Sequence, residues 1–385
     1  YKIVEADTDA ELPPEEETFG SLILGLTEEG LEIRDGYRGQ AHLLEKGQPA
    51  HKIPREAVTK VLLELLEKKE SVAGGDFCRV DLSNRDLSGV DFSGCYLEAA
   101  DFTNAKLAGA NLEGAILSFA NLSGCDLSGA KLSGANLGAA NLRRASLEGA
   151  DLSEAELGRA NLTGAKLAGC DLTGVEMAEA NLEGADLRAV IYPDAMFYEM
   201  EMARVNFAKA NLSGSQFVEC NLAESDFSEA TLEEASWVES NVDNGDFTYA
   251  NMTNARFPGG TSLREARFVR TDLNTANLRE ADLYRANFTE ANLYMAHLGD
   301  ANAQQAVFTN ADARMAQFIG TDLGGADLSS MNVMEGSLMK ARLTSAKLTN
   351  ANCYGVEFMH ATVGETDFSG AILSGTKLEK WSPRR

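Results

Sequence analysis

The chain has 385 residues, with 34 basic and 59 acidic side chains, and its formal net charge at pH 7 is -25. This excess of carboxylates disfavours direct binding to nucleic acid or to an anionic membrane. No apolar run approaches the roughly 20 residues of a transmembrane helix, and no secretory signal peptide opens the chain. Because the sequence begins at Tyr1 and not at methionine, it is either a fragment of a longer polypeptide or lacks residues that were missing or removed.

The first seventy residues contain no repeat. Residues 1–20 are predicted to be an acidic linker, since Asp7 to Glu17 is rich in carboxylates and contains two adjacent prolines. Residues 21–70 are predicted to form a small N-terminal region. Within it, Ser21 to Leu26 and Leu31 to Arg34 suggest a hairpin across Thr27-Glu28-Glu29-Gly30.

The segment from Pro54 to Lys69 is predicted to be an amphipathic α-helix. Proline suits the first turn, lysines lie near the end, and five apolar residues recur at helical spacing. These are Val58, Val61, Leu62, Leu65 and Leu66. Because the repeats begin where the helix ends, we expect the helix to cap them; recognition of a partner by the same helix is the alternative.

Every fifth residue from Phe77 to Phe257 is apolar, and almost every residue two places before it is small. In the unit Ala110-Asn111-Leu112-Glu113-Gly114, Ala110 and Leu112 can point inward while Asn111 points outward. The next inward residue, Ala115, lies three places after Leu112, so the chain has to turn at Glu113-Gly114. Short sides joined by corners form a coil.

The phase of the repeat changes once. The central apolar residue falls at numbers ending in 2 or 7 up to Phe257, and at numbers ending in 3 or 8 from Leu263 to Leu378. This divides the repeats into a first segment (71–257), a phase break (258–262) with one inserted residue, and a second segment (263–378), followed by a tail (379–385). Pro258, Gly259 and Gly260 predict a bulged corner or a kink at the break, that is, a tolerated insertion or a hinge.

Repeats such as Ala120-Asn121-Leu122-Ser123-Gly124 and Ala150-Asp151-Leu152-Ser153-Glu154 resemble those of pentapeptide-repeat proteins. The resemblance implies an all-β repeat fold, a right-handed quadrilateral β-solenoid with twenty residues per coil. Roughly 15 coils at about 4.8 Å each give a rod on the order of 70 Å long. Residues twenty apart should then stack, which predicts an inward column that becomes aromatic: Leu117, Leu137, Leu157, Met177, Phe197, Phe217, Trp237 and Phe257.

Residues able to support catalysis or metal binding are sparse. Cys95, Cys125, Cys170 and Cys220 take the small inward position on four different sides, Cys353 takes a central apolar position and Cys78 an outward one. We interpret all six as reduced, mostly buried residues of a cytosolic protein. The four histidines are scattered, and no nucleophile elbow or phosphate-binding loop is present. We therefore expect no enzyme activity, no metal and no cofactor.

Charge singles out one part of the repeats. From Ser71 to Gly260 there are 29 acidic and 12 basic residues, whereas from Thr261 to Arg385 there are 14 and 13. The candidate partner-binding residues are corner glutamates. Five of them occupy successive corners and surround one coil: Glu219, Glu224, Glu229, Glu234 and Glu239. Along one edge, Glu179, Glu199 and Glu219 stack below Glu239. They predict either a solubilising surface or a docking site for a basic partner. A nearby column of asparagines is interpreted as support for the ladder. It contains Asn121, Asn141, Asn161, Asn181, Asn221 and Asn241. Ile191, in an outward position, predicts an exposed apolar spot.

Three classes of function fit these features. The first is a rigid scaffold for protein interactions. The second is DNA mimicry, because the repeats and acidity resemble those of quinolone-resistance pentapeptide-repeat proteins, which implies binding to a type II topoisomerase. The third follows from the stretches Ala351–Phe358 and Ala361–Phe368, which resemble the repeat half of proteins associated with type VI secretion. That resemblance implies an adaptor that loads effectors onto the secretion spike in the bacterial cytoplasm, and we take it as the most specific hypothesis.

Overall fold

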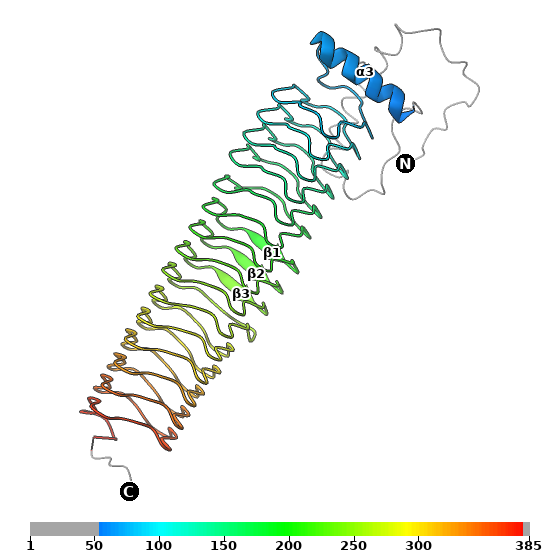
Figure 1. Ribbon diagram of the computed structural model, residues 1–385. Coiled ribbons are helices and arrows are strands. Elements are labelled where there is room, and N and C mark those ends of the chain that lie inside the picture. Colours follow the sequence, from blue (N-terminus) through cyan, green and yellow to red (C-terminus); the bar gives the residue numbers. More distant parts are fainter. Residues whose placement is uncertain (1–53, 380–385) are drawn as a thin grey trace.

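A computed structural model describes residues 54–379, and Figure 1 shows them as one long rod of stacked coils with a helix at its first end. The helix α3 spans Arg55–Lys68, and three short strands follow far along the chain: β1 (Met196–Tyr198), β2 (Gln216–Val218) and β3 (Ser236–Val238). The predicted acidic linker, the predicted hairpin and nearly all of the predicted tail lie outside the described residues.

Each coil contains four units of five residues, and isolated parallel bridges join residues twenty apart, as in Asn121 to Asn141 and Asn141 to Asn161. In a typical unit every backbone N–H has a partner, which explains the composition of the repeat. The five bonds of one unit are Asn111 N to Val90 O, Leu112 N to Lys131 O, Glu113 N to the Asn111 side-chain oxygen, Gly114 N to Ser133 O, and Ala115 N to Leu112 O. Asp or Asn is therefore favoured at the outward position. Its side-chain oxygen accepts the N–H of the residue two places later, which has no backbone acceptor in the ladder.

The corners have a common geometry. The bond from Ala115 N to Leu112 O (3.0 Å) closes a turn whose third residue, Gly114, has φ 63°. A positive φ at this position is characteristic of a type II turn and favours glycine. Many corners nevertheless hold other residues in the same left-handed conformation, among them Lys209 (φ 62°) and Glu229 (φ 57°).

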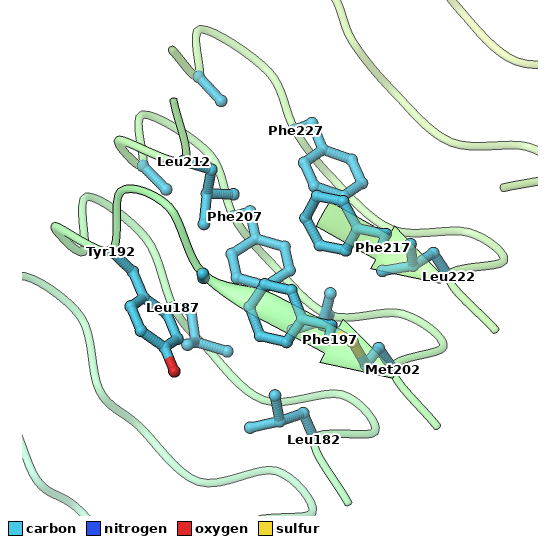
Figure 2. Close-up of a cluster of buried hydrophobic side chains, with 14 of the residues drawn as sticks. Leu182, Leu187, Tyr192, Phe197, Met202, Phe207, Leu212, Phe217, Leu222 and Phe227 are labelled. Carbon is cyan, nitrogen blue, oxygen red and sulfur yellow. The ribbon is translucent and has the colours of Figure 1, made fainter. Parts of the chain in front are cut away.

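The core is a stack of inward side chains, and its predicted aromatic column is confirmed. Phe197, Phe217, Trp237 and Phe257 follow one another with ring centroids 4.9 to 5.2 Å apart and nearly parallel planes. On the opposite side a second stack contains Phe207 and Phe227, and Figure 2 shows the two columns facing each other across the rod. The second stack continues through Phe247, Phe268, Phe288 and Phe308. Rings that stack at the coil spacing fill the core without voids.

The phase break is a bulged corner and not an interruption of the rod. Bridges span 21 residues just before it, as in Asn241 to Ser262, and 20 residues again from Ser262 to Asp282. Gly259 and Gly260 have φ 74° and 75° and absorb the extra residue. The rings of Phe247 and Phe268 remain stacked across the break, with centroids 4.9 Å apart. Since both the hydrogen-bond ladder and the core continue, the break only shifts the repeat by one residue, and the rod continues in the same direction (Figure 1).

The helix α3 lies where the sequence pattern predicts it and packs on the first coils (Figure 1). Val58 and Leu62 are fully buried in the common core, with Val61 and Leu66 partly buried against it. The Thr59 hydroxyl accepts a hydrogen bond from the backbone N–H of Asp81 (3.2 Å). These contacts are those expected of a cap, while recognition of a partner by α3 stays a prediction.

The inward cysteines replace the small residue of the unit and are buried. The Sγ–H of Cys125 donates to Phe102 O at 2.7 Å, and that of Cys95 to Val72 O at 3.0 Å. All six cysteines are free, and Cys78 is buried although it occupies an outward position. Burial raises the pKa of Cys125 and of Cys353 to about 12.

The inward and outward assignments predict two very different mutants. Leu142 is fully buried, so Leu142→Asp places an unpaired carboxylate in a dry core and should cost more than about 3 kcal/mol of unfolding free energy. Asn141→Asp keeps the oxygen that accepts the N–H of Arg143 and should change stability by less than about 1 kcal/mol. Thermal and denaturant unfolding followed by circular dichroism measures both. Equal losses would mean that the assignment is wrong.

The cysteines predict a slow reaction with thiol reagents. Burial raises the pKa of Cys78, Cys125, Cys170, Cys220 and Cys353, and Cys95 is itself fully buried. The thiols should therefore react with Ellman's reagent at pH 8 only when the chain unfolds. All six should then titrate in guanidinium. Reductant or EDTA should leave the melting temperature unchanged. Rapid reaction of several thiols in the native protein, or stoichiometric zinc after purification, would contradict this picture.

Candidate protein-interaction surface

The described part of the rod offers surfaces and no deep site. Residues 54–379 contain no group of three or more His, Cys, Asp or Glu side chains that could hold a metal ion. The same range contains no helix long and apolar enough to cross a membrane. A hollow of about 480 Å³ lies between α3 and the first coils, and another of about 370 Å³ is lined by Asn104, Asn141 and Arg143. Both are shallow and open to solvent.

The predicted run of corner glutamates is exposed and left-handed at every position. The φ angles are 54° for Glu219, 60° for Glu224, 57° for Glu229, 59° for Glu234 and 50° for Glu239. Consecutive members occupy the four successive corners of one coil, and Glu239 returns to the corner of Glu219 one coil later. The run therefore surrounds the rod as predicted, but its members face different directions and cannot all meet one partner surface.

A subset shares one corner and can act together. We call Glu179, Glu199, Glu219 and Glu239 the glutamate column. The backbone N–H of Glu199 donates to Val218 O (2.9 Å) and that of Glu219 to Val238 O (2.8 Å), so these two stack in successive coils. Glu179 forms an ion pair with Arg159 at 3.7 Å. The other three members form no ion pair within residues 54–379.

The arginines of the second segment are paired with carboxylates. Arg264 pairs with Asp282 at 2.8 Å, and Arg270 pairs with Glu290 at 2.6 Å. Every other arginine described there also has a carboxylate partner: Arg267, Arg279, Arg285, Arg314 and Arg342. The arginines of this segment are thus already paired, whereas Glu199, Glu219 and Glu239 of the glutamate column form no ion pair within residues 54–379. Electrostatic attraction for a basic partner is therefore concentrated in the first segment.

One side of the coil beside the glutamate column is apolar on its outer surface, a feature that sequence reasoning missed. We call it the strand side, because it carries β1, β2 and β3, paired in parallel in the order β1-β2-β3. Its outward Met196 is 67% exposed and Tyr198 is 54% exposed, while Val218 and Val238 are partly buried. Ile191, just before this side, is 46% exposed, which confirms the predicted apolar spot.

The three units of the strand side share two features that favour an extended third residue. Their outward residues are Met196, Gln216 and Ser236, none of which is the Asp or Asn that caps the corner N–H elsewhere. Their third residues are Tyr, Val and Val, which prefer strands over turns. Consistently, Cys220 N bonds to the Ser240 hydroxyl (3.0 Å) in place of the usual corner carbonyl. The signal was present in the sequence as Tyr198, Val218 and Val238 at the third position of these units, together with Met196 at an outward position.

Tyr198 on the strand side interacts with the carboxylates of the glutamate column. Hydrogen bonding to the Glu199 carboxylate, together with the charges of Glu199 and Glu219, raises the pKa of the Tyr198 hydroxyl. The asparagine column on the next side supports the ladder as predicted: Asn141 donates to the Asn121 side chain (3.0 Å), and the Asn181 oxygen accepts the N–H of Glu183 (2.9 Å).

Comparisons with known proteins address the family and the fold. No curated protein matches the chain. Among solved structures, HetL of the cyanobacterium Nostoc, a pentapeptide-repeat protein involved in heterocyst differentiation regulation, is 23% identical and covers 82% of this chain and 95% of its own, with a TM-score of 0.20. A pentapeptide-repeat protein of the Arabidopsis thaliana thylakoid lumen is 31% identical over 28% of this chain and 71% of its own, with a TM-score of 0.22. QnrB1, a plasmid-mediated fluoroquinolone resistance protein, is 16% identical over 56% of this chain and 88% of its own, with a TM-score of 0.25.

The family model described as Pentapeptide repeats has overlapping matches that together run over residues 81–191, 201–329 and 337–375. These matches fall on the coils described above and cover well over half of the chain. The chain therefore belongs to the pentapeptide-repeat family, whose fold is the right-handed quadrilateral β-solenoid that the repeats predict.

Proposed function

We propose that the chain is a noncatalytic protein-interaction scaffold that acts as an adaptor for effector loading in type VI secretion, in the bacterial cytoplasm. The specific role rests on the resemblance of Ala351–Phe358 and Ala361–Phe368 to the repeat half of such adaptors. The general role rests on the surface: a rod with open hollows, a balanced second segment and an acidic first segment. Its partner is a protein with a basic docking surface, and neither nucleic acid nor membrane is a direct partner.

The single observation that supports docking through charge is the run of five corner glutamates. The left-handed corner favours glycine, as at Gly214 just before the run, and other residues cost about 1 kcal/mol or more there. Turn energetics thus do not favour glutamate at five successive corners, and mutual repulsion opposes it. Because other side chains also occupy left-handed corners along the rod, it is the succession of five like charges that sets this run apart.

The second candidate is a DNA mimic that binds a type II topoisomerase. It is favoured by the net charge of about -17 from Ser71 to Gly260, given by 29 acidic and 12 basic residues. Two experiments distinguish the adaptor from the DNA mimic. Addition of the purified chain to a supercoiling assay with DNA gyrase should leave activity unchanged if the chain is an adaptor, and should inhibit it if the chain is a mimic. Affinity capture from a bacterium with a type VI system should return an effector or a spike component.

Neutralising the run tests the role of its charge. The variant with Glu219, Glu224, Glu229, Glu234 and Glu239 replaced by glutamine keeps the corners and removes repulsion, so folding should be unchanged or slightly more stable. Binding to the captured partner should weaken about tenfold, with a flatter dependence on salt, because rim charges act through steering and complementarity. Titration by calorimetry at low and moderate salt measures both.

A matched control replaces corner glutamates outside the run. Glu280, Glu335 and Glu365 have φ between 56° and 62° and lie in the second segment. Their glutamine variant should bind like the parent. If the five-residue variant also binds like the parent at both salt concentrations, the run is a solubilising surface only.

A further inference from the structure

We propose that the strand side between Met196 and Pro258 is a docking site for a basic amphipathic α-helix of a protein partner. This inference rests on the proposed function, since it names the class of partner that the acidic part of the rod binds. It goes further in making the apolar row, and not the charge, the determinant of binding.

The first support is a continuous apolar row across four coils. Tyr198, Val218 and Val238 are paired in register in β1, β2 and β3, and Glu239 N bonds to the carbonyl of Pro258, which places Pro258 next in the row. Met196 lies beside Tyr198 and is the most exposed large apolar side chain among the described residues. Outward positions elsewhere on the first segment are mostly polar, so this surface differs from a merely solvated face.

The second support is the charge along the row. Glu199, Glu219 and Glu239 follow Tyr198, Val218 and Val238 in the chain and line one edge of the row. Asp194 and Glu234 occupy corners at the other edge, and they too form no ion pair within residues 54–379. One edge of the strip thus carries three successive carboxylates, and the other carries two that are separated by Gly214. An apolar strip with carboxylates on both sides is complementary to an apolar stripe flanked by Lys and Arg.

The third support decides between a helix and an added strand. Backbone groups of the strand side bond along the rod, as in Gln216 N to Ala195 O (2.8 Å) and Ser236 N to Ser215 O (2.9 Å). The side therefore presents no free strand edge, and a partner has to bind through side chains.

The spacing of the row suits a helix laid along the axis of the rod. Successive coils are about 4.8 Å apart and successive turns of an α-helix about 5.4 Å apart. Over the three intervals from Tyr198 to Pro258 the two patterns differ by only about 2 Å, so side chains at i, i+4, i+7 and i+11 can follow the row. A helix of about three to four turns fits the site.

The test uses a synthetic helical peptide as the probe. Its sequence contains leucine at i, i+4, i+7 and i+11 and lysine on both flanks, and a scrambled peptide of identical composition has no apolar stripe. Fluorescence anisotropy measures binding of both to the complete chain at about 50 and 300 mM salt. The helical peptide should bind more tightly than the scrambled one at both salt concentrations.

The decisive variant is Met196→Ser combined with Tyr198→Ser. Both side chains are exposed, so the fold should be retained, and affinity for the helical peptide should fall about tenfold or more. The matched control is Met315→Ser combined with Tyr354→Ser, which removes the same two residue types at 43% and 49% exposure on the second segment. The control should bind like the parent.

Other results would overturn the proposal in identifiable ways. If the serine variant binds like the parent while glutamine at Glu199, Glu219 and Glu239 abolishes binding, the proposed charge-based docking stands and the apolar site is wrong. If the helical peptide does not bind the parent although the natural partner responds to the glutamine variant, the helix assignment is wrong. If the parent is a dimer that the serine variant dissociates, the occupant is a second copy of this chain and not a partner helix.

Discussion

The hydrogen-bond ladder between successive coils is the constraint on which the rest of the structure depends. In a coil of twenty residues, a typical unit supplies a turn and a side chain that caps one backbone N–H, as Asn111 does for Glu113. Small residues such as Ala115 then fill the inside of the corner, and the central residue fills the core. Because bonds run along the axis, the four sides expose side chains and no unpaired strand edge, and recognition on them is recognition of side chains.

The fold could be predicted in detail because its determinants repeat. The twenty-residue stacking of Phe197, Phe217 and Trp237 follows from position alone, and the rings do stack. The insertion could be located to residues 258–262, but its structural outcome could not be predicted, since a bulge and a kink require the same glycines. What decided it is that the Thr261 hydroxyl donates to the Trp237 carbonyl (2.6 Å) and holds the corner against the preceding coil.

The candidate surface was only half predictable. The five-residue spacing predicts that Glu199, Glu219 and Glu239 share one column and that Glu224, Glu229 and Glu234 lie at the other corners. Which of these carboxylates already have a cation partner could be read only from the structure. Glu229 has Lys209 at 3.7 Å, and nothing in the five-residue period requires that contact. Met196 and Tyr198 were overlooked because the outward positions were interpreted through their charges, although Ile191 next to them was recognised. The identity of the partner is not encoded by the period at all, since the repeat specifies a shape.

The strand side also shows how a surface can change without changing the rod. Beneath it, Phe197, Phe217, Trp237 and Phe257 form a rigid stack that continues the core. Above it, strand-forming residues in turn positions extend the chain into β1, β2 and β3, and Met196 and Tyr198 are exposed there. The Trp237 indole N–H is buried without a hydrogen-bond partner among residues 54–379, at a cost of about 1 to 3 kcal/mol that phenylalanine would avoid. The largest ring of the core thus lies beneath the strand side, where its stacking between Phe217 and Phe257 offsets part of that cost.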